Sequence, residues 1–192
     1  MKGKSLPKMR IALCGAGSTG KTTLVCRLLE DPEIKALGFV RCNVDARKLI
    51  DDFGKPFDSY SQKEYQEFQR KYVEIKSKIE TNKDNFITDR SFVDSAAYWL
   101  TRDAAGESNN IVEPFLSYCR EKSNAYDLHV FCPTGIINVE QDGYRTNDLL
   151  QYQLVSDNIK KCLISWKLEY IELSFKNLDE RVRTVKEIIL KK

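Results

Sequence analysis

The sequence predicts an α/β fold, a parallel β-sheet with helices on both faces that forms a three-layer sandwich in one domain over residues 1–192. Three observations support this prediction. Short apolar segments of strand length alternate with longer segments of helical periodicity along the chain. The first segment, 9–15, is apolar at nearly every position, which is typical of strands buried on both faces. With 192 residues, 42% apolar and 31% charged, the chain can bury one sizeable core.

The first three expected elements follow one another closely. The strand over 9–15 reads MRIALCG, and the helix over 20–30 ends before Pro32, which cannot continue it. A second strand is expected over 38–44, where GFVRCNV places apolar residues behind a glycine. Because helices separate the strands, right-handed crossovers make the strands parallel.

A long helix and a third strand occupy the middle of the chain. The helix is expected over 61–82, because Ser61 and Glu64 form a capping box and apolar residues recur at spacings of three and four. The recurring residues are Tyr65, Phe68, Tyr72, Ile75 and Ile79. The segment 85–89, NFITD, is the expected third strand.

The second half of the chain continues the alternation. Helices are expected over 91–102, from Glu113–Pro114 onward, over 147–165 and over 177–190, and strands over 126–132 and 169–174. A proline suits the first turn of a helix, where its missing N–H removes no hydrogen bond. In parallel sheets ligands bind beyond the carboxyl ends of the strands, so the residues after each strand are the candidates for a site.

A glycine-rich turn joins the first strand to the first helix. It reads G-x-x-x-x-G-K-T from Gly15 to Thr22, the pattern of a phosphate-binding loop, or P-loop. Its backbone N–H groups and the helix N-terminus attract phosphates, Lys21 can reach the β- and γ-phosphates, and the Thr22 hydroxyl can hold Mg²⁺. We therefore predict that ATP and Mg²⁺ bind here. The predicted contacts are Gly15, Ala16, Gly17, Ser18, Thr19, Gly20, Lys21, Thr22 and Thr23.

The third expected strand ends in Asp89 and Arg90. A carboxylate in this position can order Mg²⁺ and its waters, or can accept the proton of an attacking hydroxyl in a small-molecule kinase. Arg90 could clamp a phosphate or a hydroxyl of the acceptor. Because charges at the end of a buried strand are costly, we predict that both residues are functional. Ser91 and Asp94 fit an ordinary helix cap.

The end of the second expected strand carries Asp45 and Arg47. They could bind an acceptor, or they could be a helix N-cap followed by a surface arginine. In the loop GKPFDSYS, Phe57 and Tyr60 are candidates to stack on the base of an acceptor, because loops hold ligand residues disproportionately. Each aromatic residue could instead belong to the core.

A long irregular stretch follows the fourth expected strand. Such loops, here 133–147, tend to be lids that close over a substrate. Arg145 lies beside the Asp142–Gly143 turn and could neutralise charge on a transferring phosphoryl group. The alternative is an ordinary surface loop.

The segments CGAGSTGKTTL, FITDRSFVDSAAYW and QDGYRTND together resemble P-loop nucleoside and nucleotide kinases. The resemblance is closer to the ATPase and kinase group similar to bacterial ribosylnicotinamide kinase, and more distant to thymidylate kinase. It implies a five-stranded parallel sheet of order 2-3-1-4-5 and transfer of the ATP γ-phosphoryl group to a nucleoside or nucleotide. By family pattern Asp89 and Arg90 face the acceptor, and Arg145 comes from the lid.

The sequence departs from this family at one point and leaves other functions open. A glutamate usually stands three residues before the arginine after the second strand; here Val44 holds that place, and Asp45 is the nearby carboxylate. A regulatory ATPase or GTPase switch is the alternative, although the fourth strand ends in CPTG and not in a guanine-specific motif. Similar kinases of viral origin modify bases within DNA, so DNA is a further candidate acceptor. Many nucleotide kinases dimerise, which makes a homodimer compatible with the resemblance.

Charge and apolar runs indicate the environment of the protein. The net charge is +3, and residues 1–8 form a basic tail ahead of a nearly neutral body, which is weak support for contact with nucleic acid. No apolar run approaches a membrane span or the core of a signal peptide, so a cytoplasmic protein is expected. The six cysteines are scattered and His129 is the single histidine, which argues against a zinc site.

Overall fold

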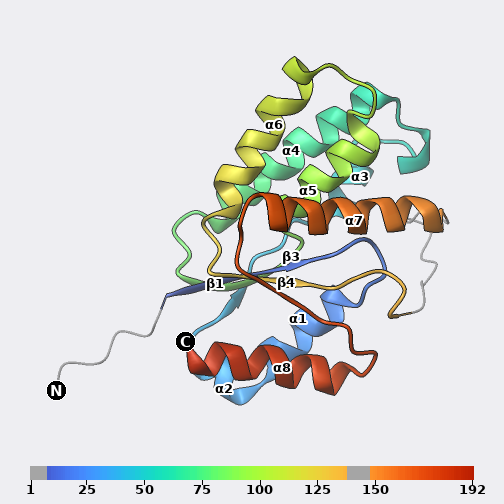
Figure 1. The fold of residues 1–192 in the computed structure, drawn as a ribbon. Coiled ribbons are helices and arrows are strands. Elements are labelled where there is room, and N and C mark those ends of the chain that lie inside the picture. The colour runs from blue at the N-terminus through green and yellow to red at the C-terminus, as the bar shows by residue number, and fades with distance from the viewer. Residues whose placement is uncertain (1–7, 138–147) are drawn as a thin grey trace.

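A computed structural model describes residues 8–137 and 148–192 and contains one five-stranded parallel sheet (Figure 1). The strand order is β2-β3-β1-β4-β5, which confirms the expected fold class and order. The strands are β1 (Met9–Cys14), β2 (Val40–Arg41), β3 (Asn85–Asp89), β4 (Leu128–Phe131) and β5 (Tyr170–Glu172).

Strand β1 lies at the centre of the sheet. It pairs with β3, where Ile11 lies opposite Ile87, and with β4, where Leu13 lies opposite Val130. Five of its six residues are buried, because helices cover both faces of the sheet. The segment after β1 is therefore held by strands on both sides.

The helices form two layers, as Figure 1 shows. On one face lie α1 (Lys21–Glu30), α2 (Pro32–Ala36) and α8 (Leu178–Lys191). On the other face lie α3 (Ala46–Asp52), α4 (Gln62–Glu80), α5 (Phe92–Tyr98), α6 (Asn109–Ser123) and α7 (Leu149–Ser165). Each layer has its own core. Alternate residues of β1 enter different cores: Ile11 and Leu13 face α1 and α8, whereas Ala12 and Cys14 face the larger layer.

Several element boundaries differ from the sequence predictions. Helix α6 begins at Asn109, so the predicted start at Glu113–Pro114 is wrong, and Pro114 lies inside the helix. The predicted helix over 91–102 divides at Trp99 into α5 and a π-helical turn, η2 (Trp99–Asp103), in which Ala104 N donates to Trp99 O at 2.8 Å. The second strand is much shorter than expected.

Helix α2 and one turn were not predicted, and α3 is the helix that the alternative interpretation of Asp45 as an N-cap implied. Asp31 caps α2 and Asp45 caps α3, each by accepting hydrogen bonds from the backbone of the first turn. The loop that follows α3 forms a 3₁₀ turn, η1 (Phe57–Ser59). Residues after β2 are thus ordered by a capped helix.

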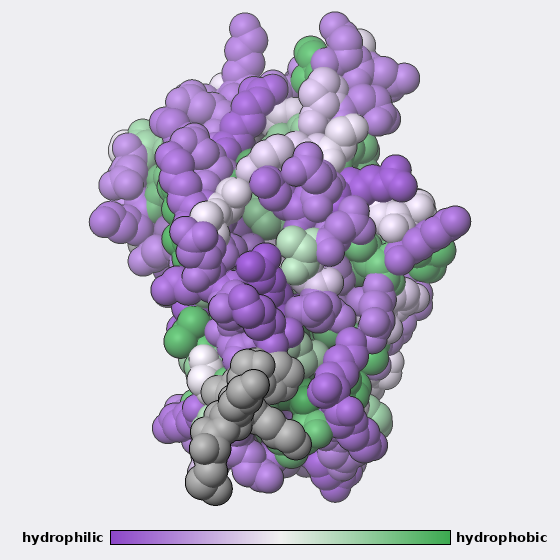
Figure 2. All heavy atoms as spheres, turned by 90° about the vertical axis from the view of Figure 1, so that its left-hand side faces the viewer, coloured by the Kyte–Doolittle hydropathy of each residue, from purple (hydrophilic) through white to green (hydrophobic). Residues whose placement is uncertain are grey.

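The face shown in Figure 2 lies at the amino ends of the strands and is mostly hydrophilic, with only scattered apolar areas. Among the described residues, no helix combines the length and the apolarity that a bilayer span requires. The candidate residues gather at the opposite, carboxyl end of the sheet, where parallel sheets bind ligands.

Candidate active site

The turn between β1 and α1 is a tight loop packed against neighbouring elements. A Cβ added to Gly15 would lie 2.4 Å from the Cys132 carbonyl oxygen at the end of β4, and one added to Gly17 would lie 2.9 Å from the Tyr152 ring of α7. These positions accept no side chain, so the backbone itself forms the surface of the loop. Backbone N–H groups at the start of a helix fit the charge of a phosphate.

Lys21, the first residue of α1, is only 5% exposed and reaches back across the loop. Its Nζ donates to the Ala16 carbonyl oxygen at 2.6 Å and to Thr19 Oγ1 at 3.0 Å. An ammonium group has three protons to donate, so the third can serve another acceptor. The lysine is positioned as a cation within the loop.

Thr22 connects the loop to the end of β3. Its hydroxyl donates a short hydrogen bond to Asp89 Oδ2, and the Asp89 backbone N–H donates to Asn43 Oδ1 at 2.8 Å. Within the described residues, no group of three His, Cys, Asp or Glu side chains could hold a metal by itself. A hydroxyl beside one carboxylate nevertheless suits Mg²⁺, which takes its remaining ligands from water and phosphates.

Arg90 adopts an unusual backbone conformation directly after β3. Its φ is +73°, in the left-handed region that non-glycine residues rarely occupy. The conformation is held because Arg90 N donates to Leu13 O at 3.0 Å and Thr88 Oγ1 donates to Arg90 O at 3.3 Å. Such strained residues cluster at functional sites.

The Arg90 guanidinium lies 5.2 Å from the centre of the Tyr98 ring. Burial raises the pKa of Tyr98, but the positive charge of Arg90 and its hydrogen bond to the phenol oxygen outweigh burial and lower this pKa overall. The Arg90 and Tyr98 side chains therefore interact electrostatically and together form one wall of the site.

Asp94 ties this wall to the loop. It is 1% exposed, and its Oδ1 accepts from Gly15 N at 2.9 Å. Its Oδ2 accepts from Ser91 N at 2.7 Å and Ser91 Oγ at 2.9 Å, which confirms the predicted cap. The contact with Gly15 was not predicted, because the two residues are 79 positions apart.

Several of these features meet in one cavity of about 1070 Å³, whose lining takes Gly17, Thr22 and Thr23 from the predicted loop contacts but not Lys21. Such a volume is sufficient for a nucleotide-sized ligand and a second small molecule. Its lining comes from the loop, the ends of β2 and β3, α3, η1, α4, α5, η2 and α7. The lining includes Gly17, Thr22, Thr23, Asp45, Arg47, Phe57, Tyr65, Gln69, Asp89, Arg90, Asp94, Tyr98, Arg102 and Tyr152.

The structure brings together most, but not all, of the residues predicted to bind an acceptor. Asp45, Arg47, Phe57 and Arg90 line the cavity. Asp45 is also the cap of α3, where it accepts from Lys48 N at 3.0 Å, so the helix-cap interpretation is confirmed without removing it from the site.

Tyr60 is not among the residues that line the cavity. It is 6% exposed, its hydroxyl donates to Ile50 O at 3.3 Å, and its ring packs against Phe53 and Phe57. The turn η1 directs this side chain into the aromatic core. Tyr60 is therefore a core residue, which was the alternative interpretation, whereas Phe57 lines the cavity.

The predicted lid falls mainly outside the described residues. Arg145 lies in 138–147, so its place in the site stays a prediction. The described part, 133–137, contains Thr134, whose Oγ1 donates to Tyr152 O at 3.4 Å. This contact ties the start of the stretch to α7.

Arg102 lines the cavity although no sequence pattern singled it out. Its guanidinium lies 4.1 Å from the Tyr65 ring centre and 4.8 Å from that of Phe57, and its Nε donates to Asp103 Oδ1 at 2.5 Å. The spacing of four from Tyr98 in a helical segment was the only signal that could have placed it on the same wall. Asp103 is fully buried, and burial raises its pKa to about 6 even though Arg102 opposes the shift.

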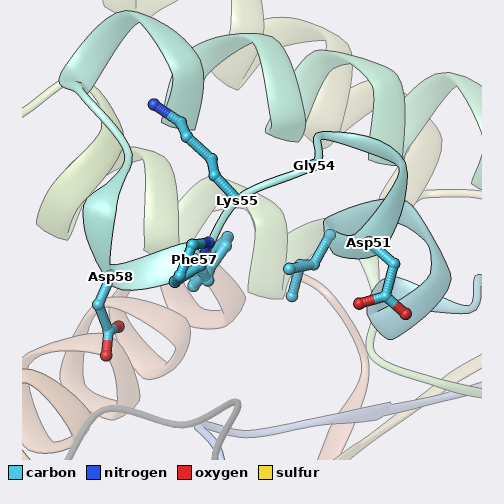
Figure 3. A pocket seen from close by; sticks show the side chains of 7 residues that line it. Asp51, Gly54, Lys55, Phe57 and Asp58 are labelled. Atoms are coloured by element: carbon cyan, nitrogen blue, oxygen red, sulfur yellow. The ribbon is translucent and has the colours of Figure 1, made fainter.

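A smaller cavity of about 280 Å³ adjoins the large one (Figure 3). Only residues from 50–58 line it, and no strand end contributes. Figure 3 shows Lys55 pointing away from Asp51 and Asp58, and its Nζ pairs with Glu64 at 2.6 Å. Phe57 lines both cavities. Because the loop, Asp89 and Arg90 line only the large cavity, we place the site there.

Comparisons with known proteins agree with this fold. A family model described as an AAA domain matches residues 10–181. No curated protein matches the sequence.

Several solved structures have a similar fold. NadR protein in complex with NR is 16% identical with a TM-score of 0.63, covering 94% of this chain and 49% of NadR, so this chain spans about half the length of NadR. Thymidylate kinase from Candida albicans is 16% identical with a TM-score of 0.59 over 96% of this chain and 92% of that enzyme. Deoxyadenosine kinase from M. mycoides with bound dATP is 14% identical with a TM-score of 0.62 over 94% and 99% of the two chains.

Proposed function

The chain belongs to the AAA-domain family, and from that premise we propose that it is a kinase that transfers the γ-phosphoryl group of ATP to a nucleoside or nucleotide. Three proteins of similar fold support this acceptor class. NadR protein was solved in complex with NR, and the other two are a thymidylate kinase and a deoxyadenosine kinase. The proposal rests on the site, and these likenesses support the choice of acceptor class.

One observation carries the proposal: Gly17, Thr22 and Thr23 of the phosphate-binding loop line the same cavity as the charged end of β3. The hydrogen bond from Thr22 to Asp89 joins the loop to the end of β3, which supports assigning them to one site. A protein that only hydrolyses ATP needs room for a water molecule beside the γ-phosphate. A kinase needs a second binding site there, and the cavity extends from Asp89 past Arg90 to Arg47 and Phe57.

The residues divide into donor and acceptor groups. Lys21 and the N–H groups of residues 16–23 would hold the phosphates of ATP, while the Gly15 N–H donates to Asp94. Thr22 and Asp89 would hold Mg²⁺, which supplies charge neutralisation when bound. Transfer between oxygens needs mainly positioning, so the remaining role is to align the acceptor.

In the alternative role, Asp89 would instead accept the proton of the attacking hydroxyl, which then bonds to the γ-phosphorus as the bond to the β-phosphate oxygen breaks. Arg90 would neutralise charge on the transferring group or on an acceptor phosphate. Phe57 would stack on the acceptor base, Asp45 and Arg47 would bind its polar groups, and Arg145 would approach from the lid. These roles are proposals for a single domain, residues 1–192, acting in the cytoplasm as a monomer or homodimer.

Label transfer from [γ-³²P]ATP tests the proposal. The protein is incubated with MgATP and, separately, with nucleosides, nucleoside monophosphates and short DNA duplexes that contain normal or hydroxymethylated bases. We expect label on one class of acceptor, with a DNA acceptor indicating base modification. The variant Asp89→Asn is the matched negative control. Release of inorganic phosphate alone, at the same rate with every acceptor, would contradict the kinase proposal. It would favour a regulatory ATPase, the second candidate, which is compatible with the AAA-domain match.

A further inference from the structure

Arg181 of α8 occupies a position where the sequence pattern calls for an apolar residue. It lies on the buried face of the helix with Val185 and Ile189, at spacings of four, and it is 0% exposed. The next arginine of the helix, Arg183, is exposed, as is usual for its type. An arginine in an apolar stripe is expensive to bury, so its contacts require explanation.

Within the described part of the chain, the Arg181 guanidinium donates hydrogen bonds to backbone carbonyl oxygens. Nη1 donates to Thr19 O at 2.8 Å, Nε to Phe175 O at 2.9 Å and Nη2 to Leu173 O at 3.4 Å. Thr19 belongs to the phosphate-binding loop, 162 positions earlier in the chain. The side chain therefore joins the loop to the segment between β5 and α8.

The charge of Arg181 has no carboxylate partner within residues 8–137 and 148–192. Three cationic residues are buried there: Lys21, Lys76 and Arg181. Lys76 pairs with Glu80 at 2.6 Å. The other two donate only to carbonyl and hydroxyl oxygens, and both contact the loop. The two buried cations without a carboxylate thus both contact Thr19 of the loop, and a phosphate bound in the loop would offset the cost of burying them.

The contact also orients one peptide group of the loop. Thr19 and Gly20 are joined by a trans peptide bond, in which the Thr19 C=O and the Gly20 N–H point in opposite directions. Since Arg181 holds the Thr19 carbonyl toward α8, the Gly20 N–H points away from α8. A Cβ on Gly20 would lie 3.0 Å from Arg181 Nη1, so the guanidinium is in close contact with this residue.

We propose that Arg181 is a positioning residue of the phosphate site: it fixes the Thr19–Gly20 peptide and adds a buried positive charge behind the loop. The inference rests on the nucleotide-binding part of the proposed function and is independent of the acceptor. The affinity of the loop for a polyphosphate therefore depends on the positive charge at position 181. Occupation of the loop is likewise coupled to the packing of α8 against it.

The test compares Arg181→Met and Arg181→Lys with Arg183→Met, which removes an exposed arginine from the same helix. Affinities for MgADP, inorganic triphosphate and adenosine are measured by calorimetry well below the unfolding midpoint of each variant. We expect Arg181→Met to weaken binding of ADP and triphosphate by about 10- to 100-fold, the effect of one charge-assisted hydrogen bond, with binding of adenosine changed far less. Arg181→Lys should recover part of the loss, because it restores the charge without the planar fork.

A second measurement follows amide hydrogen exchange of 173–191 with and without MgADP. We expect MgADP to slow amide exchange of 173–191 in the wild type and in Arg183→Met, and to slow it less in Arg181→Lys. The Arg181→Lys variant keeps the test decisive if Arg181→Met does not fold. Equal affinity for ADP and triphosphate in the wild type and Arg181→Lys, with equal protection, would overturn the inference. Failure of the wild type to bind either compound would instead overturn the proposed function, and a wild type that binds both without transferring phosphate would leave the role of Arg181 intact.

Discussion

The donor side of the site and its acceptor side are built in different ways. The proposed donor side is one continuous segment, residues 15–23, in which backbone groups and Lys21 would hold the phosphates. The acceptor side combines side chains from β2, α3, η1, α4, α5 and η2, brought together only by the fold. A site made of one segment has a sequence signature, whereas a site made of many segments has none. The difference explains why ATP binding could be predicted more fully than the acceptor.

The largest expected effect comes from the residue that joins the two sides. Asp89→Asn keeps the shape of the side chain and an oxygen that can accept from Thr22, but it removes the negative charge. We expect kcat for transfer to fall by about 10²- to 10⁴-fold, the usual contribution of a general base, while the KM for ATP changes little.

The matched control is Asp84→Asn, at an exposed carboxylate that pairs with Lys8. If Asp89→Asn transfers phosphate at the wild-type rate, the end of β3 has no part in the reaction. A loss confined to ATP affinity would place Asp89 on the donor side alone.

Lys21→Met breaks the donor side. The variant keeps the aliphatic stem but removes the ammonium group bonded to Ala16 O and Thr19 Oγ1. We expect transfer to fall by about 10²- to 10³-fold, as when one preorganised donor to a developing charge is lost. The acceptor, measured in the absence of ATP by thermal shift, should bind as before.

The control for this prediction is Lys35→Met, at an exposed lysine of α2. Loss of acceptor binding in Lys21→Met, without loss in the control, would show that the two sides are not separate.

The sequence predicted the regular part of the fold well, because hydrophobic periodicity is local. The strand 85–89 has the predicted bounds, and the capping box of α4 is present. The start of α6 was missed because Pro114 suggested a first turn, although the chain accommodates it inside the helix. The contacts of Asp94 with Gly15 and of Arg181 with Thr19 span 79 and 162 positions, so no local pattern reports them.

The free energy of unfolding should depend on pH through Asp103, the buried partner of Arg102. The folded-state pKa of Asp103, about 6, lies above the ordinary value of 3.8, because burial disfavours its charged form. The folded state therefore binds this proton more tightly than the unfolded state, and Asp103 reduces stability as pH rises from about 4 to about 6. Asp103→Asn does not titrate, so its stability relative to the wild type should rise by about 2–3 kcal/mol between pH 4 and pH 7.

Urea unfolding of both proteins at several pH values measures this difference. The other titrating groups are common to the two proteins and cancel in the comparison. A difference that stays constant from pH 4 to pH 7 would show that Asp103 does not hold a proton in the folded state.

The smallest expected effects separate two aromatic residues of one turn. Phe57→Leu should raise the KM of the acceptor about tenfold, because an aromatic contact with a base is lost. Tyr60→Phe removes a buried hydroxyl that donates to Ile50 O, so it should cost about 1 kcal/mol of stability and leave the KM unchanged. Steady-state kinetics and thermal unfolding of both variants give the comparison. Equal effects on KM would mean that Tyr60 also contacts the acceptor.

The central claim is that the donor and acceptor sides are halves of one two-substrate site. Its most direct test is competition by a bisubstrate compound that joins adenosine to the acceptor nucleoside through a polyphosphate bridge. Calorimetry should find one molecule bound per chain, displacing both a non-hydrolysable ATP analogue and the acceptor, and binding at least about 100-fold more tightly than either. If the compound displaces the ATP analogue but leaves acceptor binding unchanged, the two sides do not form one site.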